Sequence, residues 1–349
     1  MTMMKACRLL RIGDLRCEEV PLPEPRGEEL LLRVRACGIC GSDLPRVFVH
    51  GSSNGKYPLI IGHEFAGEVV AVGEQASTSL IGKRGAVYPL IPCRQCDPCS
   101  IGQYAMCENY DYLGSRRNGG FAEYCLLPSA WHLVCADNAP MEALAMTEPA
   151  CVAQHALRRA GVTAGQFVVI YGAGAIGMMA ARWAEIFGAR ALLADIDDAK
   201  VAFAKKIGLD AVNSLNEDVP EAIRARNGGR LADAAIEGTG ASSALQGCIQ
   251  SIRFCGNIAL LGNPAVNTML LLKLHSMLMR KEANVRGVWN SSRTPQPADE
   301  WKYTVRMLDT NRLAVTDLIT DRISLEELPR AMAEIHSGQR KIVKAMYVR

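Results

Sequence analysis

The sequence predicts an α/β protein in which a β-rich part is joined to a doubly wound parallel sheet. Up to about residue 135, strand-like apolar runs such as Leu30–Ala36 and Gly67–Val72 are bounded by Gly, Pro and Glu. From about Ala150 onward, short apolar strands alternate with segments of helical spacing, which is typical of parallel sheets with right-handed crossovers. A glycine-rich turn at 172–177 follows the first of these strands and supports the same prediction.

The second part carries the clearest periodicity. Its expected strands are Gln166–Tyr171, Ala191–Ala194, Ala232–Ile236 and Ile258–Leu261. Its expected helices are Cys151–Ala160, Met178–Phe187, Lys200–Ile207 and Ala244–Phe254. From about residue 291 the sequence pattern no longer alternates regularly between strands and helices, and it predicts a helix at Asp299–Leu308 and a strand-like end at Ile342–Val348. We therefore divide the chain into segments 1–152, 153–290 and 291–349.

The composition bears on partners and location. The chain has 349 residues and a formal net charge of +3 from 39 basic and 36 acidic side chains, so neither nucleic acid nor a membrane surface is expected as a partner. No segment approaches the roughly 18 uninterrupted apolar residues of a membrane span. Met1–Leu10 lacks an apolar run of signal-peptide length. The 13 cysteines are therefore expected in a reducing cytoplasm, where clusters indicate metal and single residues indicate packing.

Four cysteines form the pattern C-x2-C-x2-C-x7-C, namely Cys93, Cys96, Cys99 and Cys107. Zinc prefers four thiolates in a tetrahedron, and ligands this close in sequence can hold one ion within a single loop. The alternative is a set of buried free thiols, which do not usually cluster in this way. A four-thiolate site has no open coordination position, so we predict a structural zinc here and expect the chemistry elsewhere.

Gly172, Gly174 and Gly177 form the pattern G-x-G-x-x-G between a predicted strand and a predicted helix. The glycines permit a tight turn, a close approach of pyrophosphate and close packing of helix on strand. Ala175 and Ile176 complete this cofactor-binding turn, and the N-terminus of the helix that follows faces the phosphates. Asp195, 18 residues after Gly177, ends the next strand, and a carboxylate there favours NAD over NADP because it binds ribose hydroxyls and repels a 2′-phosphate. The alternative is a glycine-rich turn without a ligand.

The order of the motifs resembles that of a known family. The chain carries A-C-G-I-C-G-S-D around Cys40, G-H-E-F-A-G-E at Gly62–Glu68, the four-cysteine pattern, G-G-F-A-E-Y at Gly119–Tyr124 and the glycine motif, in this order. Over nearly its whole length it resembles the zinc-containing medium-chain dehydrogenases, which include alcohol, sorbitol and threonine dehydrogenases. The resemblance implies a GroES-like β-rich catalytic domain, an inserted Rossmann domain and a C-terminal return to the first domain.

The resemblance also implies a second, catalytic zinc, and therefore two zinc ions per subunit. Its ligands would be Cys40 and His63, with Glu64 and Glu148 as direct or nearby carboxylates. In this family zinc lowers the pKa of the substrate hydroxyl, NAD accepts hydride, and a hydroxyl at the position of Ser42 begins the proton relay. Ser42 could cap a turn before Asp43, with or without a role in the relay, and Glu148 could instead be an N-cap-like residue before a helix.

Several residues bear on the substrate. Arg46, Arg116 and Arg117 carry guanidinium groups, which bind phosphate with two parallel hydrogen bonds, and the S-R-R string resembles members that act on polyol phosphates such as galactitol 1-phosphate. Asn290 lies in G-V-W-N-S-S, which resembles the same branch. The arginines equally suit a solvated turn. A free polyol such as sorbitol, or L-threonine, remains an alternative substrate, and a non-catalytic NAD-binding protein is an alternative of another class. By family analogy we expect a homodimer or homotetramer.

Overall fold

The computed structural model describes residues 2–294 and 299–349 and divides the chain into two compact units. The first unit consists of Met1–Glu148 and Ser292–Arg349, and the second consists of Pro149–Ser291. The chain therefore leaves the first unit, builds the second and returns. No helix in the described ranges combines the length and the apolar character that crossing a bilayer requires.

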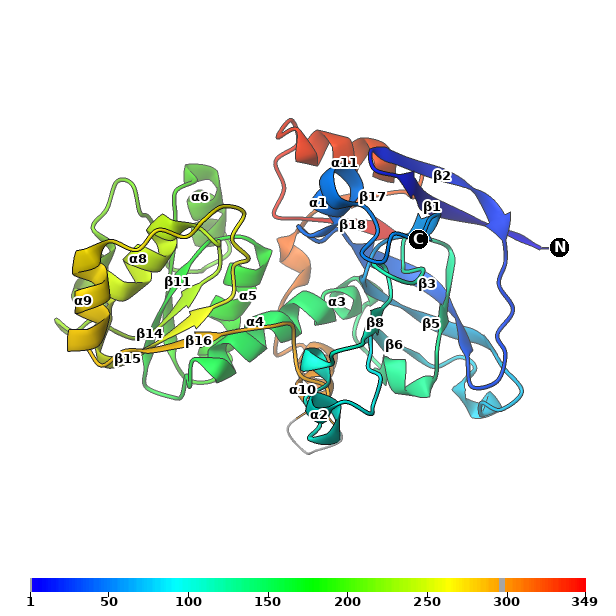
Figure 1. Cartoon of the computed structure of the whole chain (residues 1–349), viewed down its shortest axis with the longest axis horizontal. Coiled ribbons are helices and arrows are strands. Elements are labelled where there is room, and N and C mark those ends of the chain that lie inside the picture. Colours follow the sequence, from blue (N-terminus) through cyan, green and yellow to red (C-terminus); the bar gives the residue numbers. More distant parts are fainter. Residues whose placement is uncertain (1, 295–298) are drawn as a thin grey trace. The chain divides into compact units, whose positions relative to one another are not determined.

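The first unit is built mainly on antiparallel strands, and only β17 and β18 among the paired strands of its described residues run parallel (Figure 1). A three-stranded sheet has the order β2-β1-β4, and a seven-stranded sheet has the order β10-β6-β5-β3-β18-β17, with β9 also paired to β3. The strands of these sheets are β1 Met3–Arg11, β2 Asp14–Pro21, β3 Leu30–Gly38, β4 Leu59–Ile60, β5 Glu64–Val72, β6 Arg84–Val87, β9 Tyr124–Leu127, β10 Leu133–Cys135, β17 Ile319–Ile323 and β18 Lys344–Val348. Two short strands, β7 Leu90–Ile91 and β8 Asp111–Tyr112, pair with each other.

The helices of this unit are short and lie mostly between strands. They are α1 Asp43–Pro45, a π-helical turn η1 at Arg46–His50, α2 Asp97–Ser100, α3 Met141–Ala145, α10 Glu300–Asp309 and α11 Leu328–His336. Single 3-10 turns occur at Thr78–Leu80, Tyr104–Met106, Ala130–His132 and Thr316–Leu318. The core is continuous from the first hairpin through β3 and β5 to α11 and β18, so the C-terminal segment completes the same hydrophobic core.

The second unit is a parallel sheet with the order β13-β12-β11-β14-β15-β16. Helix α4, Thr147–Arg159, begins with two residues of the first unit and continues into the second. The other elements of the second unit are β11 Phe167–Tyr171, α5 Ala175–Ile186, β12 Arg190–Asp195, α6 Asp198–Lys206, β13 Ala211–Asn213, α7 Val219–Arg226, β14 Ala232–Glu237, α8 Ser242–Ser251, β15 Ile252–Leu260, α9 Leu272–Arg280 and β16 Asn284–Gly287. Helices lie on both sides of this sheet (Figure 1). The strand order reverses between β11 and β14, and such a switch point is where open α/β sheets bind their ligands.

The structure confirms the predicted fold class, and it corrects three local expectations. Helix α5 begins at Ala175 rather than Met178, because the N–H groups after the glycine turn already belong to its first turn. Residues 252–254, expected at the end of a helix, open β15 instead, so tertiary pairing with β14 overrides local propensity. The hairpin β1–β2 and helix α11 were not expected at all.

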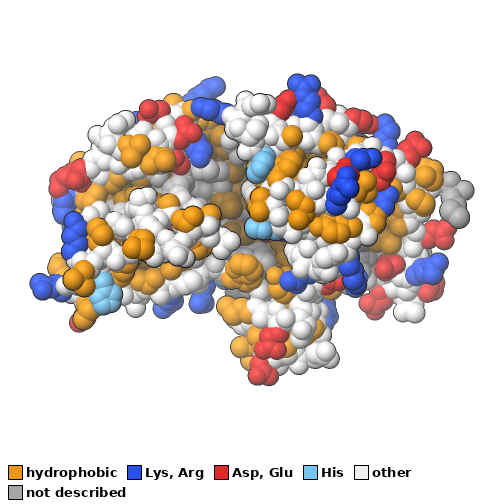
Figure 2. All heavy atoms as spheres, turned by 45° about the horizontal axis from the view of Figure 1, so that its top comes forward, with side chains coloured by type: hydrophobic (Ala, Val, Ile, Leu, Met, Phe, Trp, Pro, Cys, Tyr) orange, Lys and Arg blue, Asp and Glu red, His pale blue; other side chains and the backbone are white. Residues whose placement is uncertain are grey.

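The face of the molecule in Figure 2 carries basic and acidic side chains interspersed among apolar ones. No single basic patch dominates this view, as the near-neutral net charge of +3 leads one to expect.

Candidate functional site

Three of the expected ligands meet at the neighbouring ends of β3 and β5. Cys40 follows β3, His63 directly precedes β5 and Glu64 opens it, and their ligand atoms all lie within 4.8 Å of one another. The antiparallel register of the two strands pairs Gly38 with Glu64, so strand pairing brings these sequence-distant residues together. We call this set the Cys40–His63–Glu64 cluster.

Two glycines make room for the cluster. Gly62 has a φ of +91°, and a Cβ there would lie 2.6 Å from the Phe121 ring and 2.8 Å from Cys37 Sγ. A Cβ on Gly38 would lie 2.3 Å from Glu64 Oε2, so the carboxylate occupies the space that any larger residue would fill. Cys37 itself is buried on β3 and belongs to the core, as expected for a packing residue.

Asp43 lies close to two of the three ligands, and no role was predicted for it from the sequence. The side chain is 0% exposed. Its Oδ2 accepts a hydrogen bond of 3.0 Å from the Cys40 N–H, and its Oδ1 lies 3.5 Å from His63 Nδ1. This leaves Nε2 as the ring nitrogen that can bind a metal, an arrangement common for metal-ligating histidines. The sequence signal that pointed to Asp43 was its position in the string C-G-S-D, which begins at Cys40.

A buried lysine holds the carboxylate of Glu64. Lys344 Nζ, from the last strand, donates to Glu64 Oε2 at 2.5 Å and to the Ile39 carbonyl at 3.0 Å. Burial lowers the pKa of Lys344, but Glu64 and Cys40 more than offset this, so the pKa is raised and the ammonium stays charged. No role was predicted for Lys344 from the sequence, although a lysine inside an apolar strand needs a buried partner.

Glu148 lies near the cluster but outside its 4.8 Å group. It is the second residue of α4, is 8% exposed, and accepts a hydrogen bond of 3.3 Å from the Tyr112 hydroxyl. Burial raises the pKa of Glu148 to about 7, the charge of His63 opposes the rise, and Glu64 adds to it. The edge of the Tyr112 ring in turn contacts the His63 ring, with the ring centroids 5.8 Å apart.

These donors suit a zinc ion. A thiol, an imidazole and carboxylates are the ligand types that zinc takes in catalytic sites. Burial lowers the pKa of His63, but the negative charges of Cys40 and Asp43 raise it well above its ordinary value. Acidic groups therefore outweigh the single nearby lysine, and a divalent cation would balance this excess of negative charge.

The four expected structural ligands also come together. The sulfurs of Cys93, Cys96, Cys99 and Cys107 lie within 4.8 Å of one another on a loop that contains α2. The N–H of Cys93 donates to Cys107 Sγ at 3.2 Å. Backbone N–H groups of Gln95 and Cys96 hold the pKa of Cys93 down at about 6, which favours the thiolate that zinc requires. The geometry fits a tetrahedral site of four sulfurs.

The glycine motif forms the turn between β11 and α5 in the second unit. Gly172 has a φ of +109°, and a Cβ on Gly177 would lie 1.9 Å from the Gly172 carbonyl oxygen. Glycine is therefore required at both positions for the turn and for close packing. Ala175 and Ile176 form the first turn of α5, whose N–H groups have no carbonyl one turn back and face outward as anion donors.

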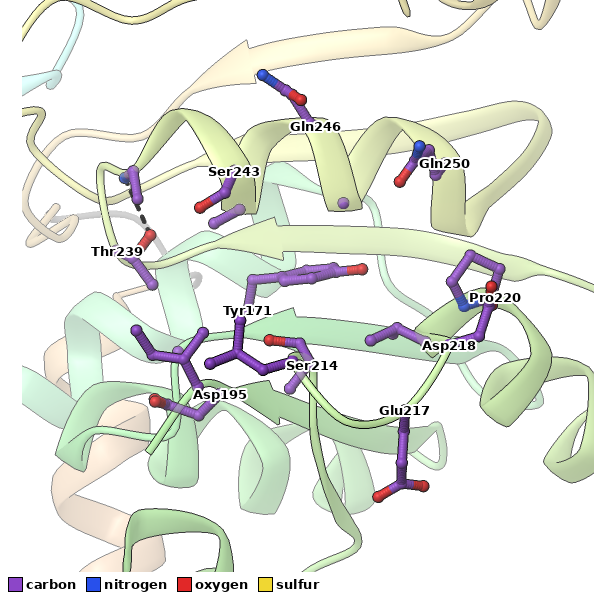
Figure 3. Close-up of a pocket in the computed structure, with 18 of the residues that line it drawn as sticks. Tyr171, Asp195, Ser214, Glu217, Asp218, Pro220, Thr239, Ser243, Gln246 and Gln250 are labelled. Carbon is purple, nitrogen blue, oxygen red and sulfur yellow. Dashed lines mark hydrogen bonds between the residues drawn. The ribbon is translucent and has the colours of Figure 1, made fainter. Parts of the chain in front are cut away.

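A cavity of about 830 Å³ opens beside this turn (Figure 3). Gly172, Asp195, Ser214 and Thr239 are among the residues that line it. Asp195 is 9% exposed, and its Oδ2 and Oδ1 accept hydrogen bonds from the N–H groups of Ala173 (2.7 Å) and Asp197 (3.0 Å). The carboxylate is thus fixed at the end of β12, at the rim of a cavity large enough for a nucleoside.

The candidate phosphate ligands differ in their surroundings. Arg46 donates to Ser53 Oγ at 2.6 Å, and its buried Nε has no hydrogen-bond partner among the described residues. Arg116 stacks on the Tyr110 ring at 3.9 Å and donates to the Tyr110 carbonyl. The loop that contains Ser53 also binds the backbone of 115–116, so Arg46 and Arg116 belong to connected segments.

Arg117 stands apart from these two. Its guanidinium pairs with Asp111 at 2.5 Å, and its side chain is 53% exposed. The carboxylate of Asp111 neutralises the charge of Arg117 within the turn. The structure therefore supports a phosphate-binding role less for Arg117 than for Arg46 or Arg116. Asn290 lies in the second unit with a φ of 58°, and its side chain accepts a hydrogen bond from the next N–H.

Ser42 is exposed and lies beside the cluster. Its hydroxyl donates to Cys40 Sγ at 3.2 Å, and its N–H lies 3.5 Å from the same sulfur. It precedes α1 without capping it through its side chain, so the alternative of a capping serine finds no support. The hydroxyl is thus positioned at the sulfur of a candidate ligand.

Comparisons with known proteins agree with this geometry. The model of the alcohol dehydrogenase GroES-like domain matches residues 26–137, and that of the zinc-binding dehydrogenases matches 175–310. A zinc-type alcohol dehydrogenase-like protein of Haemophilus influenzae is 34% identical over 98% of this chain and 97% of its own length. Galactitol 1-phosphate 5-dehydrogenase of Escherichia coli K12 is 33% identical over 93% and 94%, and sorbitol dehydrogenase of Bacillus subtilis is 30% identical over 98% and 96%.

Solved structures of dehydrogenases have the same fold as this chain. Galactitol-1-phosphate dehydrogenase from Escherichia coli superimposes with a TM-score of 0.91 at 31% identity, covering 99% of this chain and 100% of that one. An alcohol dehydrogenase from E. coli CFT073 in complex with NADH has a TM-score of 0.88 at 25% identity, with 100% of each chain covered. From these matches and the sites above, the chain belongs to the family of zinc-binding, zinc-type alcohol and polyol dehydrogenases.

Proposed function

We propose that this enzyme oxidises a secondary hydroxyl of a polyol phosphate, such as galactitol 1-phosphate, to the ketose phosphate with NAD and zinc. The observation that carries the proposal is the Cys40–His63–Glu64 cluster, in which His63 and Glu64 are buried and Cys40 is half-buried, with Glu148 beside it. The chain also carries a nucleoside-sized cavity that Asp195 helps to line. A second zinc would be held by the four sulfurs of the 93–107 loop, giving two per subunit.

The residues of the cluster have separable roles in this proposal. Zinc would be held by Cys40 and His63 with one or both glutamates, and when bound it supplies the Lewis acidity that lowers the pKa of the substrate hydroxyl. Asp43 keeps His63 in the tautomer that leaves Nε2 free. The exposed Ser42 Oγ can accept the proton that the substrate loses and pass it toward solvent.

Asp195 is proposed to select NAD over NADP. Replacement of Asp195 by alanine removes a charged acceptor whose hydrogen bonds to the ribose are worth about 1.5–3 kcal/mol. The KM for NAD should therefore rise about tenfold to hundredfold, while the KM for NADP should change little. Steady-state kinetics with both cofactors measure this. Asp197→Ala is the matched control, because Asp197 only caps α6 through the N–H groups of Ala199 and Lys200. An unchanged preference in Asp195→Ala would contradict the assignment.

Phosphate recognition is proposed to rest on Arg46 and Arg116, with Arg117 as a weaker candidate. Arg116→Ala should lower kcat/KM for a phosphorylated polyol about tenfold to hundredfold, the effect of one charge-assisted hydrogen bond, and leave the free polyol unaffected. Arg117→Ala, in the same turn but paired with Asp111, should have a smaller effect. Equal losses on both substrates would show that Arg116 only supports the fold.

Paired substrates test the proposal as a whole. Galactitol and galactitol 1-phosphate, sorbitol and its 6-phosphate, and L-threonine would be compared for NADH formation by the zinc-loaded protein. Turnover confined to the phosphorylated member of a pair supports the proposal. Faster turnover of a free polyol favours the sorbitol-like alternative, in keeping with the sorbitol dehydrogenase relative. NAD binding without turnover of any compound would favour the non-catalytic alternative.

We further propose a cytoplasmic homodimer or homotetramer that acts on a small molecule. Strand β16 ends the sheet order of the second unit, and all four of its residues, Asn284–Gly287, are exposed. Leu271 and Leu272 beside α9 are exposed as well. Association of copies would bury such an edge. Light scattering coupled to gel filtration should give two or four times the 37.8 kDa chain mass, whereas a monomer would contradict the proposal.

A further inference from the structure

Two cysteines outside both metal sites face each other across the first hairpin. The antiparallel register of β1 and β2 pairs Cys7 directly with Cys17. The N–H of Leu22 donates to the Thr2 carbonyl, which makes residues 2 and 22 a hydrogen-bonded pair. Hydrogen-bonded pairs recur at every second position along the ladder, so residues 6 and 18 form one such pair and residues 8 and 16 form the next. Cys7 and Cys17 lie between these two pairs and are therefore a non-hydrogen-bonded pair.

This position is the one that a disulfide can span. Residues in a non-hydrogen-bonded pair have Cα atoms about 4.5 Å apart and side chains on the same face of the sheet. A disulfide needs a Cα separation of about 4.4–6.8 Å, so bridging requires no movement of the strands. In agreement with this register, the Cys7 N–H points away from β2 and donates to the Phe121 carbonyl at 2.8 Å.

The two thiols differ in access and in acidity. Cys7 is 0% exposed and donates to the Leu325 carbonyl at 3.0 Å, whereas Cys17 is half-buried and reaches the surface. The Cys7 thiol interacts with the Cys17 sulfur, and this interaction lowers the pKa of Cys17. The positive charge of Lys5, on the same face of the sheet, lowers the pKa of Cys17 as well. Cys17 is therefore the thiol that an incoming reagent meets, and Cys7 is the one placed behind it.

We propose that Cys7 and Cys17 form a reversible dithiol–disulfide site that low-molecular-weight disulfides such as glutathione disulfide oxidise. Neither residue belongs to the two metal clusters of the described residues. A transient, redox-responsive disulfide is also the kind that a reducing compartment permits. The proposal does not depend on the substrate assigned above.

The reaction is a balanced two-step exchange. The Cys17 thiolate attacks one sulfur of glutathione disulfide, forms a mixed disulfide and releases one glutathione thiolate. The Cys7 sulfur, having lost its proton, then attacks Cys17 Sγ and expels the second glutathione thiolate. The two cysteines lose two electrons and two protons, and one glutathione disulfide becomes two glutathione molecules. The new bond replaces the hydrogen bond from Cys7 to the Leu325 carbonyl.

Peptide mapping of the zinc-loaded full chain tests the proposal. The protein is treated with glutathione disulfide, free thiols are alkylated, and tryptic peptides are analysed without reduction. Arg8, Arg11 and Arg16 lie between the two cysteines, so a bond between them appears as two cross-linked peptides. We expect this cross-link, and we expect dithiothreitol to remove it. The exposed Cys135 and Cys255 serve as internal references that report whether the reagent has acted.

Two variants separate the roles of the cysteines. Cys7→Ser keeps a donor for the Leu325 carbonyl and should leave a stable glutathione adduct on Cys17. Cys17→Ser should leave the buried Cys7 unmodified. Modification of Cys135 and Cys255 with both Cys7 and Cys17 still alkylated would overturn the proposal. Release of zinc without the cross-link would overturn it too, because the loop cysteines would then be the reactive ones.

Discussion

Replacing Cys40 with alanine should abolish turnover and remove one of the two zinc ions that we propose for each chain. Cys40 supplies the only sulfur in the Cys40–His63–Glu64 cluster, and the Ser42 hydroxyl donates a hydrogen bond to that sulfur. Loss of the catalytic ion removes several kcal/mol of charge stabilisation, so kcat/KM should fall about a thousandfold or more. Zinc analysis by mass spectrometry and steady-state kinetics on the same preparation measure both effects.

Cys37→Ala is the matched control for this substitution. Cys37 lies three residues earlier, is buried in the core, and is not part of the cluster. Its removal should cost stability only, with zinc content and kcat/KM close to those of the unmodified chain. If Cys40→Ala kept both zinc ions, the assignment of this cluster as the catalytic metal site would be wrong.

Replacing Lys344 with methionine should destabilise the zinc-free protein by about 3–5 kcal/mol, because it leaves the carboxylate of Glu64 buried without its partner. Lys344 Nζ lies 2.5 Å from Glu64 Oε2, and the two side chains are 6% and 1% exposed. Methionine keeps most of the volume and removes the charge together with the hydrogen bonds to Glu64 and the Ile39 carbonyl. Denaturant unfolding followed by circular dichroism measures the free energy of unfolding, and its slope reports whether two-state behaviour is kept.

A double-mutant cycle provides the control for Lys344. Adding Glu64→Gln to Lys344→Met removes the unpaired charge and should recover part of the lost stability. Lys344→Arg, which keeps the positive charge, should be milder than Lys344→Met. A Lys344→Met protein within about 0.5 kcal/mol of the original would contradict the buried pair, since that is the size of an ordinary surface substitution.

The features that could be predicted from the sequence are those that a local sequence pattern determines. The parallel sheet follows from alternating strands and helices, and the turn at Gly172 follows from glycine spacing that the backbone itself requires, with a φ of +109° there. The cysteines of the 93–107 loop are close in sequence, so their proximity in space needs no tertiary information. Cys40 and His63 could be proposed only through the resemblance to a family.

What could not be predicted depends on contacts between distant segments. Lys344 and Glu64 are 280 residues apart, and they meet because β18 and β5 both pair with β3. Tyr112 lies on the short strand β8, where nothing in the local pattern points to Glu148. The arginine pair 116–117 illustrates the converse, because neighbours in sequence have different surroundings: one stacks on Tyr110 and the other pairs with Asp111.

The central claim is that zinc in this chain promotes direct hydride transfer from a secondary carbinol carbon to NAD. The most direct test uses a polyol phosphate that carries deuterium on that carbon, with zinc-loaded and chelator-treated protein side by side. We predict that mass spectrometry finds deuterium in the reduced nicotinamide with the zinc-loaded protein, and none after chelation, with activity restored by added zinc. Equal deuterium transfer with and without zinc would contradict the claim, as would NAD reduction without deuterium in the nicotinamide ring.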